Sequence, residues 1–257
     1  MLLRSVVKPL GEMEKRHMIQ ATSTVGRMLG AGVLLLLPAA AQALPDLVIE
    51  PGHRAGPVRR NMTEAQLKAS LPKGQARRML VHIEEDFYKC GTVVFPGTEN
   101  EAFVTWSTMD KDFEGDTQDN RTACQNLPSA SKPATVIIEG DLRNRPGRVG
   151  AWRARNGIRI GMTLRELEAA AGKPFEFSVC QCDYSGVVFG RPRQELFGNG
   201  YNLWFHIPAL PQDIEAKYVD RDRLDALKSS HVPASVARRI MLRKIVVYLE
   251  EQKASEE

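Results

Sequence analysis

Residues 56–77 read GPVRRNMTEAQLKASLPKGQAR, and residues 156–177 read NGIRIGMTLRELEAAAGKPFEF. In register, the two stretches share an arginine, a Met-Thr pair and a leucine. Thr63 and Thr163 are followed three residues later by Gln66 and Glu166, which is the capping-box pattern. The Thr hydroxyl accepts from a first-turn N–H, and the Gln or Glu side chain accepts from the N–H of the Thr. The sequence therefore predicts two helices with the same start.

The apolar residues of both stretches recur at helical spacing on one face, which predicts amphipathic helices that pack against a core. These residues are Leu67, Leu71, Leu164, Leu167 and Ala171. Because glycine adopts the left-handed C-cap conformation without a steric cost, we expect Gly74 and Gly172 to end the two helices.

Each predicted helix is followed by four segments that alternate apolar and polar residues or are rich in β-branched and aromatic residues, which is typical of strands. The first four are MLVHIEEDF (79–87), GTVVFP (91–96), EAFVTWS (101–107) and ATVIIEGD (134–141). The second four are FEFSVCQCD (175–183), GVVFG (186–190), YNLWFHI (201–207) and RKIVVYLE (243–250). Insertions at 108–133 and 212–242 interrupt the correspondence between the two sets of segments. The second insertion contains DRDRLDALKSS (220–230), which is predicted to form a short helix.

These elements predict an α+β fold of two tandem repeats, each a helix with an antiparallel sheet. One unit alone would bury a single sheet face under one helix, which makes a marginal core, whereas two units joined edge to edge or face to face bury more. The predicted boundaries are 44–141 for the first repeat, 142–155 for an Arg/Gly-rich joint and 156–257 for the second repeat.

Residues 1–43 are predicted to be a cleaved signal peptide, with Met18 as an alternative start. Arg27 precedes the apolar run MLGAGVLLLLPAAAQA (28–43), which ends with a small-x-small cleavage pattern at Ala43. The run is short for a bilayer span, although a membrane anchor is the alternative interpretation. The sequence therefore predicts a periplasmic or secreted protein with no transmembrane segment after the leader.

Net charge gives no argument for nucleic-acid binding. The chain carries 35 Lys and Arg against 31 Asp and Glu, and the predicted leader holds five of the basic and two of the acidic residues. Without the leader, 30 basic and 29 acidic residues leave a net charge of +1 in place of +4. Nucleic-acid binding needs a concentrated basic face, so no nucleic-acid partner is predicted.

All four cysteines follow the predicted leader, and an even number in an oxidising compartment favours disulfides. The preferred pairing joins Cys90 to Cys124, which ties the long polar insertion to its own sheet, and Cys180 to Cys182 as a local bridge. The local bridge requires the chain to bend. A redox role for this C-x-C pair is the functional alternative, while a zinc site with His206 lacks the paired spacing of zinc ligands.

Motifs for catalysis are absent from the sequence: there is no H-E-x-x-H, no G-x-S-x-G and no phosphate-binding glycine loop. A Ser–His–acid site stays open, because its members meet only in space. No catalytic residue, metal ligand or cofactor is predicted, and a non-enzymatic protein is favoured over an enzyme.

The segment YNLWFHI (201–207) is the best lead to a binding surface. Alternation places Tyr201, Leu203 and Phe205 on one face, where they are expected in the core. The predicted binding residues are Asn202, Trp204 and His206 on the other face, Trp106 in the first unit, and Asp183 and Tyr184 in the adjoining segment. A Trp flanked by polar side chains is a typical interface anchor. Alternatively, both tryptophans are buried at the seam between the repeats, and Asp183 and Tyr184 form only a turn.

GIRIGMTLRELEAAAGKPFEF (157–177) and CDYSGVVFG (182–190) resemble an uncharacterised family of exported bacterial proteins with the pattern G-M-T-L-x-E-L-E-x-x-N-G-K-P-F, then W-D-Y-x-G. GTVVFPGTENEAFVTW (91–106) resembles the first half of that family. The resemblance covers most of residues 50–205 and implies no established activity. The chain departs from the pattern at Ala171, which replaces Asn, and at Cys180-Gln181-Cys182, which replaces F-x-W. The capped helix before a sheet is also similar, at the level of fold, to the tandem repeats of beta-lactamase-inhibitor proteins and to small outer-membrane assembly lipoproteins.

The leading hypothesis is an exported, non-enzymatic protein-binding module, either an inhibitor or an accessory protein of the cell envelope. The first alternative is a periplasmic redox-active or hydrolytic enzyme. The second is a binder of anionic envelope polymer or lipid that uses the arginines of the joint. Those arginines are Arg143, Arg145, Arg148, Arg153 and Arg155.

Overall fold

The computed structural model describes residues 46–109, 111–141, 149–189, 200–223 and 225–250. The predicted signal peptide and residues 142–148 of the joint lie outside the described residues. The described part of the chain therefore begins at Asp46.

The two predicted capped helices are present as α1 (Glu64–Ser70) and α3 (Leu164–Ala171). In α1, the N–H of Gln66 donates to Thr63 Oγ1 at 3.1 Å and the N–H of Thr63 donates to Gln66 Oε1 at 2.8 Å. Thr163 and Glu166 make the same two bonds at the start of α3, at 3.3 and 2.7 Å. Both capping boxes are therefore confirmed.

The two helices end differently. Gly172 is the left-handed C-cap of α3, with a φ of 74°, and its N–H donates to the carbonyl of Ala169. The prediction for Gly74 is wrong, because α1 ends at Ser70 and its C-cap is Leu71 in an extended conformation. Leu71 precedes a proline, and the proline ring disfavours the helical conformation of the residue before it.

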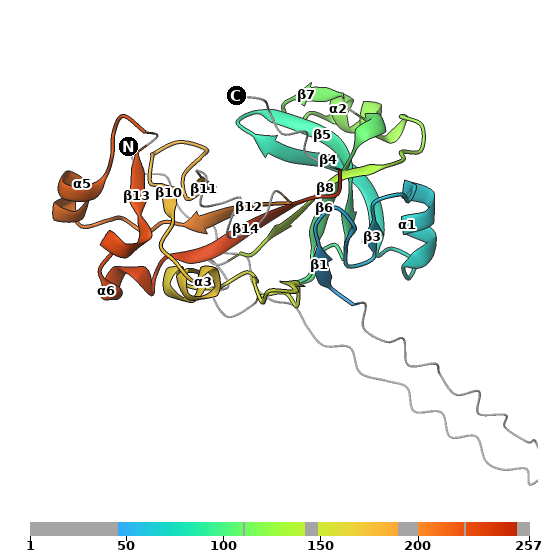
Figure 1. The fold of residues 1–257 in the computed structure, drawn as a ribbon. Helices are drawn as coiled ribbons and strands as arrows, with labels where there is room; N and C mark the ends of the chain where they lie inside the picture. Colours follow the sequence, from blue (N-terminus) through green and yellow to red (C-terminus); the bar gives the residue numbers. More distant parts are fainter. Residues whose placement is uncertain (1–45, 110, 142–148, 190–199, 224, 251–257) are drawn as a thin grey trace, which may run out of the picture. The chain divides into compact units, whose positions relative to one another are not determined.

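One seven-stranded sheet joins the strands that follow α1 to strands that follow α3. Its order is β12-β14-β8-β6-β5-β4, with β7 paired to β5, and every pairing is antiparallel. The strands are β4 (Ala76–Glu84), β5 (Phe87–Val94), β6 (Ala102–Trp106), β7 (Asp112–Glu114), β8 (Pro133–Glu139), β12 (Tyr201–His206) and β14 (Met241–Tyr248). The pair β8–β14 connects the two halves edge to edge (Figure 1).

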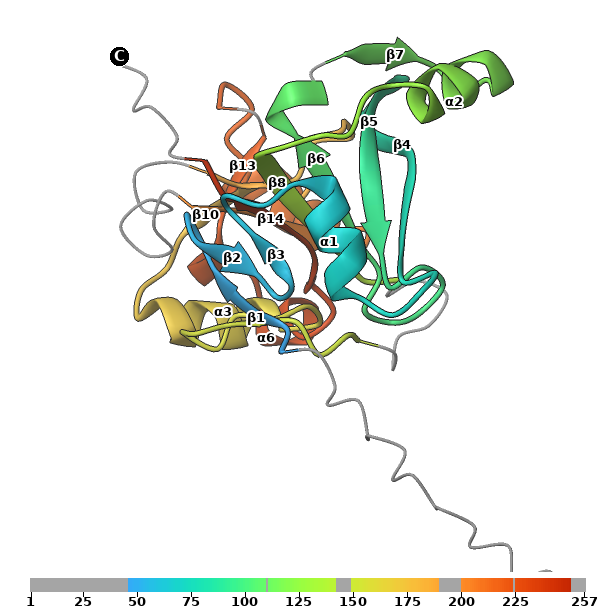
Figure 2. The ribbon, with the colours of Figure 1, turned by 90° about the vertical axis from the view of Figure 1, so that its right-hand side faces the viewer.

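The remaining strands of the described residues form two smaller sheets. One has the order β11-β10-β13 and consists of β10 (Glu176–Ser178), β11 (Val188–Phe189) and β13 (Ala226–Lys228). The other has the order β3-β2-β1-β9 and consists of β1 (Val48–Glu50), β2 (Arg54–Ala55), β3 (Val58–Arg59) and β9 (Arg153–Ala154), with β1 and β9 parallel. Figure 2 shows β2 and β3 beside α1.

The two insertions contain regular structure of their own. The first holds β7, α2 (Gln118–Gln125) and a 3-10 turn at Ser107–Met109. Figure 2 shows α2 and β7 at the end of the β4–β5 hairpin. The second holds α5 (Gln212–Tyr218), β13, a 3-10 turn at Ser229–His231 and α6 (Ala234–Ala237). The helix predicted over 220–230 is wrong, because Ala226–Lys228 pairs with β10 as a strand.

The large hydrophobic core lies on the helix side of the seven-stranded sheet. Each described α-helix contributes a buried residue to it: Leu67 from α1, Cys124 from α2, Leu167 from α3, Ile214 from α5 and Val236 from α6. Figure 1 shows α3 and α6 together on one side of β14. The structure is thus a mixed α+β protein in which the described helices pack into one core.

Among the described residues, no helix has the length and apolar character needed to cross a membrane.

Candidate functional site

The other face of the seven-stranded sheet carries a separate cluster, which we call the aromatic face. Its buried residues are Val81, Ile137 and Val246. Five partly exposed residues pack against them: Met79, Ile83, Phe103, Trp204 and Tyr248. All eight belong to β4, β6, β8, β12 or β14, and no described helix contributes to the cluster.

Alternation along β12 assigns its residues to the two faces as the sequence predicts. Tyr201, Leu203 and Phe205 are buried in the large core. Burial, and then the nearby carboxylate of Glu50, raises the pKa of the Tyr201 hydroxyl to about 12. The residues between them are partly exposed, and Trp204 belongs to the aromatic face.

Polar contacts order the aromatic face around Trp204. Lys244 Nζ lies 5.3 Å from the centroid of the Trp204 ring and 3.1 Å from Glu139 Oε1. Asn202 Nδ2 donates to the Tyr248 hydroxyl at 2.7 Å. A cation over an indole ring and a bonded Tyr–Asn pair restrict the motion of these side chains.

Trp106 does not share this face. It is 2% exposed, it packs in the large core, and its indole N–H donates to Thr92 Oγ1 at 3.1 Å. The reason is strand parity: Trp106 follows Ala102 and Val104, which also enter the large core, whereas Phe103 between them points to the aromatic face. The predicted interface role of Trp106 is therefore incompatible with its position.

Trp106 belongs to a buried polar network that no sequence pattern indicated. Its partner Thr92 donates to Glu64 Oε1 at 3.3 Å, and Glu64, which is 1% exposed, also contacts Lys68 Nζ at 2.6 Å and the guanidinium of Arg78. Burial acts to raise the pKa of the Glu64 carboxyl, but the bonds from Arg78 and Lys68 outweigh it and hold that pKa below its usual value. The Glu64 carboxylate is thus ionised at neutral pH, and it contacts the side chains of Thr92, Lys68 and Arg78.

Asp183 and Tyr184 lie at the border of the aromatic face. Tyr184 is 53% exposed. Asp183 Oδ2 accepts from the N–H of Glu85 at 3.1 Å, so this loop contacts the turn between β4 and β5. The same loop leads to Val187, which bridges to Trp204. Phe87, next to that turn, is 42% exposed. The border therefore presents two exposed aromatic side chains that the fold brings from distant parts of the sequence.

A cavity of about 740 Å³ adjoins the aromatic face at Phe103. It is lined by Gly97, Thr98, Glu99, Asn100, Glu101, Phe103, Glu139, Gly140 and Asp141. The four carboxyl side chains give this end of the face an acidic character, and the Glu139 carboxylate also pairs with Lys244.

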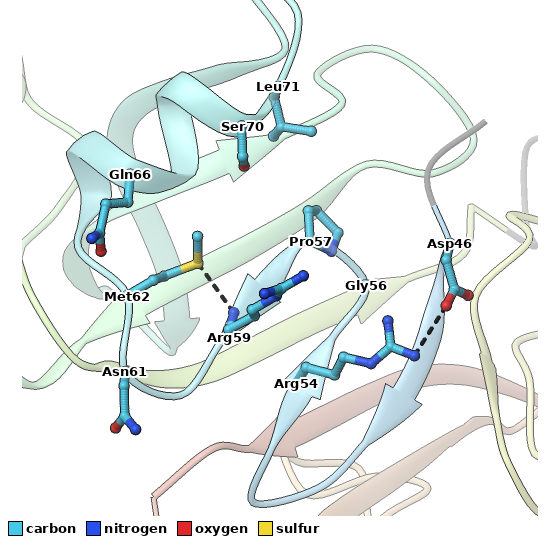
Figure 3. Close-up of a pocket in the computed structure, with 10 residues that line it drawn as sticks. All are labelled: Asp46, Arg54, Gly56, Pro57, Arg59, Asn61, Met62, Gln66, Ser70 and Leu71. Carbon is cyan, nitrogen blue, oxygen red and sulfur yellow. Dashed lines mark hydrogen bonds and ion pairs between the residues drawn. The ribbon is translucent and has the colours of Figure 1, made fainter. Parts of the chain in front are cut away.

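A second cavity, of about 650 Å³, lies between α1 and the β2–β3 hairpin (Figure 3). Its lining residues are Asp46, Arg54, Gly56, Pro57, Arg59, Asn61, Met62, Gln66, Ser70 and Leu71. Arg54 Nη2 contacts Asp46 Oδ2 at 3.0 Å and Glu50 Oε1 at 2.8 Å. The hydrogen bond from Arg54 holds the pKa of the Asp46 carboxyl below its usual value. The cavity contains none of the predicted binding residues.

Both predicted cysteine pairings are confirmed: Cys90 is bonded to Cys124, and Cys180 to Cys182. Within the described ranges, no group of three or more His, Cys, Asp or Glu side chains is arranged to hold a metal ion. Of the joint arginines, Arg153 lies in β9 and Arg155 Nη2 contacts Glu50 Oε1 at 3.1 Å, while Arg143, Arg145 and Arg148 lie outside the described residues.

Comparison with protein-family models, with characterised proteins and with solved structures finds no match to this chain. The resemblance to the exported bacterial family and the likeness to tandem inhibitor repeats therefore stay predictions.

Proposed function

We propose that this chain is an exported, non-enzymatic protein-binding module and that its partner docks on the aromatic face. The observation that carries the proposal is the contrast between the faces of one sheet. The described helices contribute to the large core, whereas the aromatic face keeps Met79, Phe103, Trp204 and Tyr248 partly exposed. Large aromatic side chains with ordered polar neighbours are the usual anchors of protein interfaces.

The surroundings of this face define the chemistry of the partner. Carboxylates line the adjoining cavity at one end, and Asp183 lies near Tyr184 at the border. A complementary surface therefore carries apolar side chains that cover Trp204 and a Lys or Arg that reaches the acidic cavity. The two disulfides favour an oxidising compartment, periplasmic or extracellular, as the place where this protein binds its partner.

The proposal includes a duplication of one helix-plus-sheet unit. Two helices with the same capping box each precede strands of the seven-stranded sheet, and β8 and β14 join the two sets. In this view the aromatic face exists only when both units are present, because Phe103 comes from the first and Trp204 from the second.

Site-specific photo-cross-linking in the native envelope tests the proposal. A photoreactive amino acid replaces Asn202 on the aromatic face, and in a control it replaces Ala170, an exposed residue of α3. We expect a discrete cross-linked protein from the Asn202 position alone, and we expect Trp204→Ala to abolish it. A protein captured equally from both positions, or from Ala170 alone, would overturn the proposed location.

A further inference from the structure

The Cys180–Cys182 disulfide differs from the other bridge in its surroundings. Cys90 and Cys124 are 1% and 0% exposed, and their bond joins β5 to α2 inside the large core. The strand β10 ends at Ser178, and the chain bends at Gln181 and Cys182, both of which are exposed. Cys180 is 9% exposed. One sulfur of the local bridge is thus on an exposed residue, and the other is on a buried one.

Backbone hydrogen bonds hold this loop independently of the bridge. The N–H of Val179 donates to the carbonyl of Asp225 at 3.0 Å, and that of Gly186 donates to the carbonyl of Ser178 at 2.8 Å. The N–H of Cys180 donates to Ser178 Oγ at 3.2 Å. These bonds fix the path of the chain on both sides of the bridge, and none of them involves a sulfur atom.

A cavity of about 270 Å³ lies directly beside the bridge. Its lining residues are Val179, Cys180, Gln181, Cys182, Ser185, Ile207, Pro208, Ala209, Leu210 and Glu215. Both cysteines line it together with apolar side chains of the 207–210 segment. Gln181, Ser185 and Glu215 add polar groups to the lining, so the hollow offers both apolar and polar contacts to a polypeptide segment whose cysteine approaches Cys182.

We propose that Cys180–Cys182 is an exchange-active disulfide that accepts two electrons from a dithiol of a bound polypeptide. This exchange is stoichiometric, without turnover, and it is independent of the proposed docking on the aromatic face. A bridge that spans one residue restricts the unfolded chain very little, so its contribution to stability is small, and an exposed disulfide is open to attack by thiolates.

The exchange proceeds in two balanced steps. A thiolate of the polypeptide attacks Cys182 Sγ, the S–S bond breaks, and Cys180 Sγ leaves as a thiolate that takes up a proton. The second cysteine of the polypeptide, as its thiolate, then attacks the sulfur of the first cysteine of the polypeptide, which is bonded to Cys182 Sγ in the mixed disulfide. Cys182 leaves as a thiolate and takes up the second proton. The polypeptide gains a disulfide, and Cys180 and Cys182 become thiols.

Differential alkylation tests the exchange on the folded, oxidised protein. The probe is a synthetic peptide with two cysteines flanked by apolar residues, added at increasing concentration before quenching and mass spectrometry. We expect Cys180 and Cys182 to be alkylated at peptide concentrations at least about 10-fold below those that open Cys90–Cys124. Equal resistance of the two bridges would overturn the proposal, as would unfolding when the local bridge opens, monitored by circular dichroism.

Two single-cysteine variants locate the attacked sulfur. Cys180→Ser leaves the exposed Cys182 thiol, and Cys182→Ser leaves the buried Cys180 thiol. With the same peptide activated as a mixed disulfide, we expect Cys180→Ser to form the covalent adduct at least about 10-fold faster. Equal rates, or a faster Cys182→Ser variant, would contradict attack at Cys182.

Discussion

The two faces of the seven-stranded sheet are built from the same strands but have different surroundings. Along β6, Ala102, Val104 and Trp106 enter a core that also contains residues of the described helices, whereas Phe103 enters a cluster made only by strands. On the first face even polar groups such as Glu64 are buried and paired. On the second, aromatic side chains stay partly exposed. One face is therefore covered by residues of the described helices, whereas the other leaves aromatic side chains partly exposed.

The largest effect is expected from breaking the buried ion pair on the helix side. Glu64→Ala leaves Arg78, whose side chain is 9% exposed, without its carboxylate partner. Removing one member of a buried pair costs about 3–5 kcal/mol of unfolding free energy. Urea unfolding followed by circular dichroism measures it. The matched control is Asp116→Ala, which breaks the exposed pair with Arg121 and should cost far less, because solvent screens exposed charges. Similar costs for both variants would contradict a special role of the buried pair.

The same carboxylate predicts a pH dependence. Because the pKa of Glu64 is lowered in the folded state, its contribution to stability is present above the unfolded pKa of about 4.5. It is lost as the pH falls through the lowered folded pKa. We expect Glu64→Gln to flatten the decrease in unfolding free energy between pH 5 and pH 2, about the range in which such carboxylates titrate. An unchanged slope in that variant would show that other carboxylates cause the decrease.

A second comparison concerns the two disulfides. In the chain-entropy description, a bridge across 34 positions stabilises by about 4 kcal/mol, and one across 2 positions by roughly 1.5 kcal/mol. We therefore expect Cys90→Ala/Cys124→Ala to lower the melting temperature far more than Cys180→Ala/Cys182→Ala. Calorimetry on both double variants measures the difference. Equal losses would mean that the local bridge also supports the fold.

Much of the fold follows from the sequence because local rules specify it. Capping boxes begin α1 and α3, and alternation along β12 correctly separates Leu203 from Trp204. Two predictions failed for different reasons. Pro72 is a local signal that ends α1 before Gly74, whereas only pairing with β10, a contact distant in sequence, makes a strand of Ala226–Lys228.

The candidate site was only partly predictable. Trp204 and Tyr184 are found from pattern and motif, but Phe87 and the contact between Asp183 and Glu85 depend on residues about 100 positions apart. For Trp106, the sequence left interface and burial as alternatives, and burial holds because the parity of Trp106 along β6 matches that of Val104 in the large core.

On the aromatic face, Trp204→Ala is expected to affect binding more than folding. Trp204 is partly exposed and holds the cation of Lys244, so its loss removes an interface anchor worth at least about 2 kcal/mol, or roughly 30-fold in affinity. Titration of the captured partner measures it, with circular dichroism to verify the fold. Unchanged affinity in a folded variant would remove Trp204 from the interface.

A smaller effect is expected at the border of the face. Tyr184→Ala removes a side chain that is 53% exposed, so the unfolding free energy should change by no more than about 0.5 kcal/mol. Affinity for the partner should fall by a factor of about 2–5, as for a residue at an interface rim. A larger loss than for Trp204→Ala would move the centre of the interface to the border.

The cross-linking experiment identifies a complex, and hydroxyl-radical footprinting of that complex then measures which face of the sheet the partner covers. The chain supplies a matched pair of probes, because Met79 lies on the aromatic face and Met62 packs against the large core, and both are partly exposed. We expect the partner to protect Met79 from oxidation and to leave the oxidation of Met62 unchanged. Protection of Met62 with continued oxidation of Met79 would place the partner on the helix side and contradict the proposed function of the aromatic face.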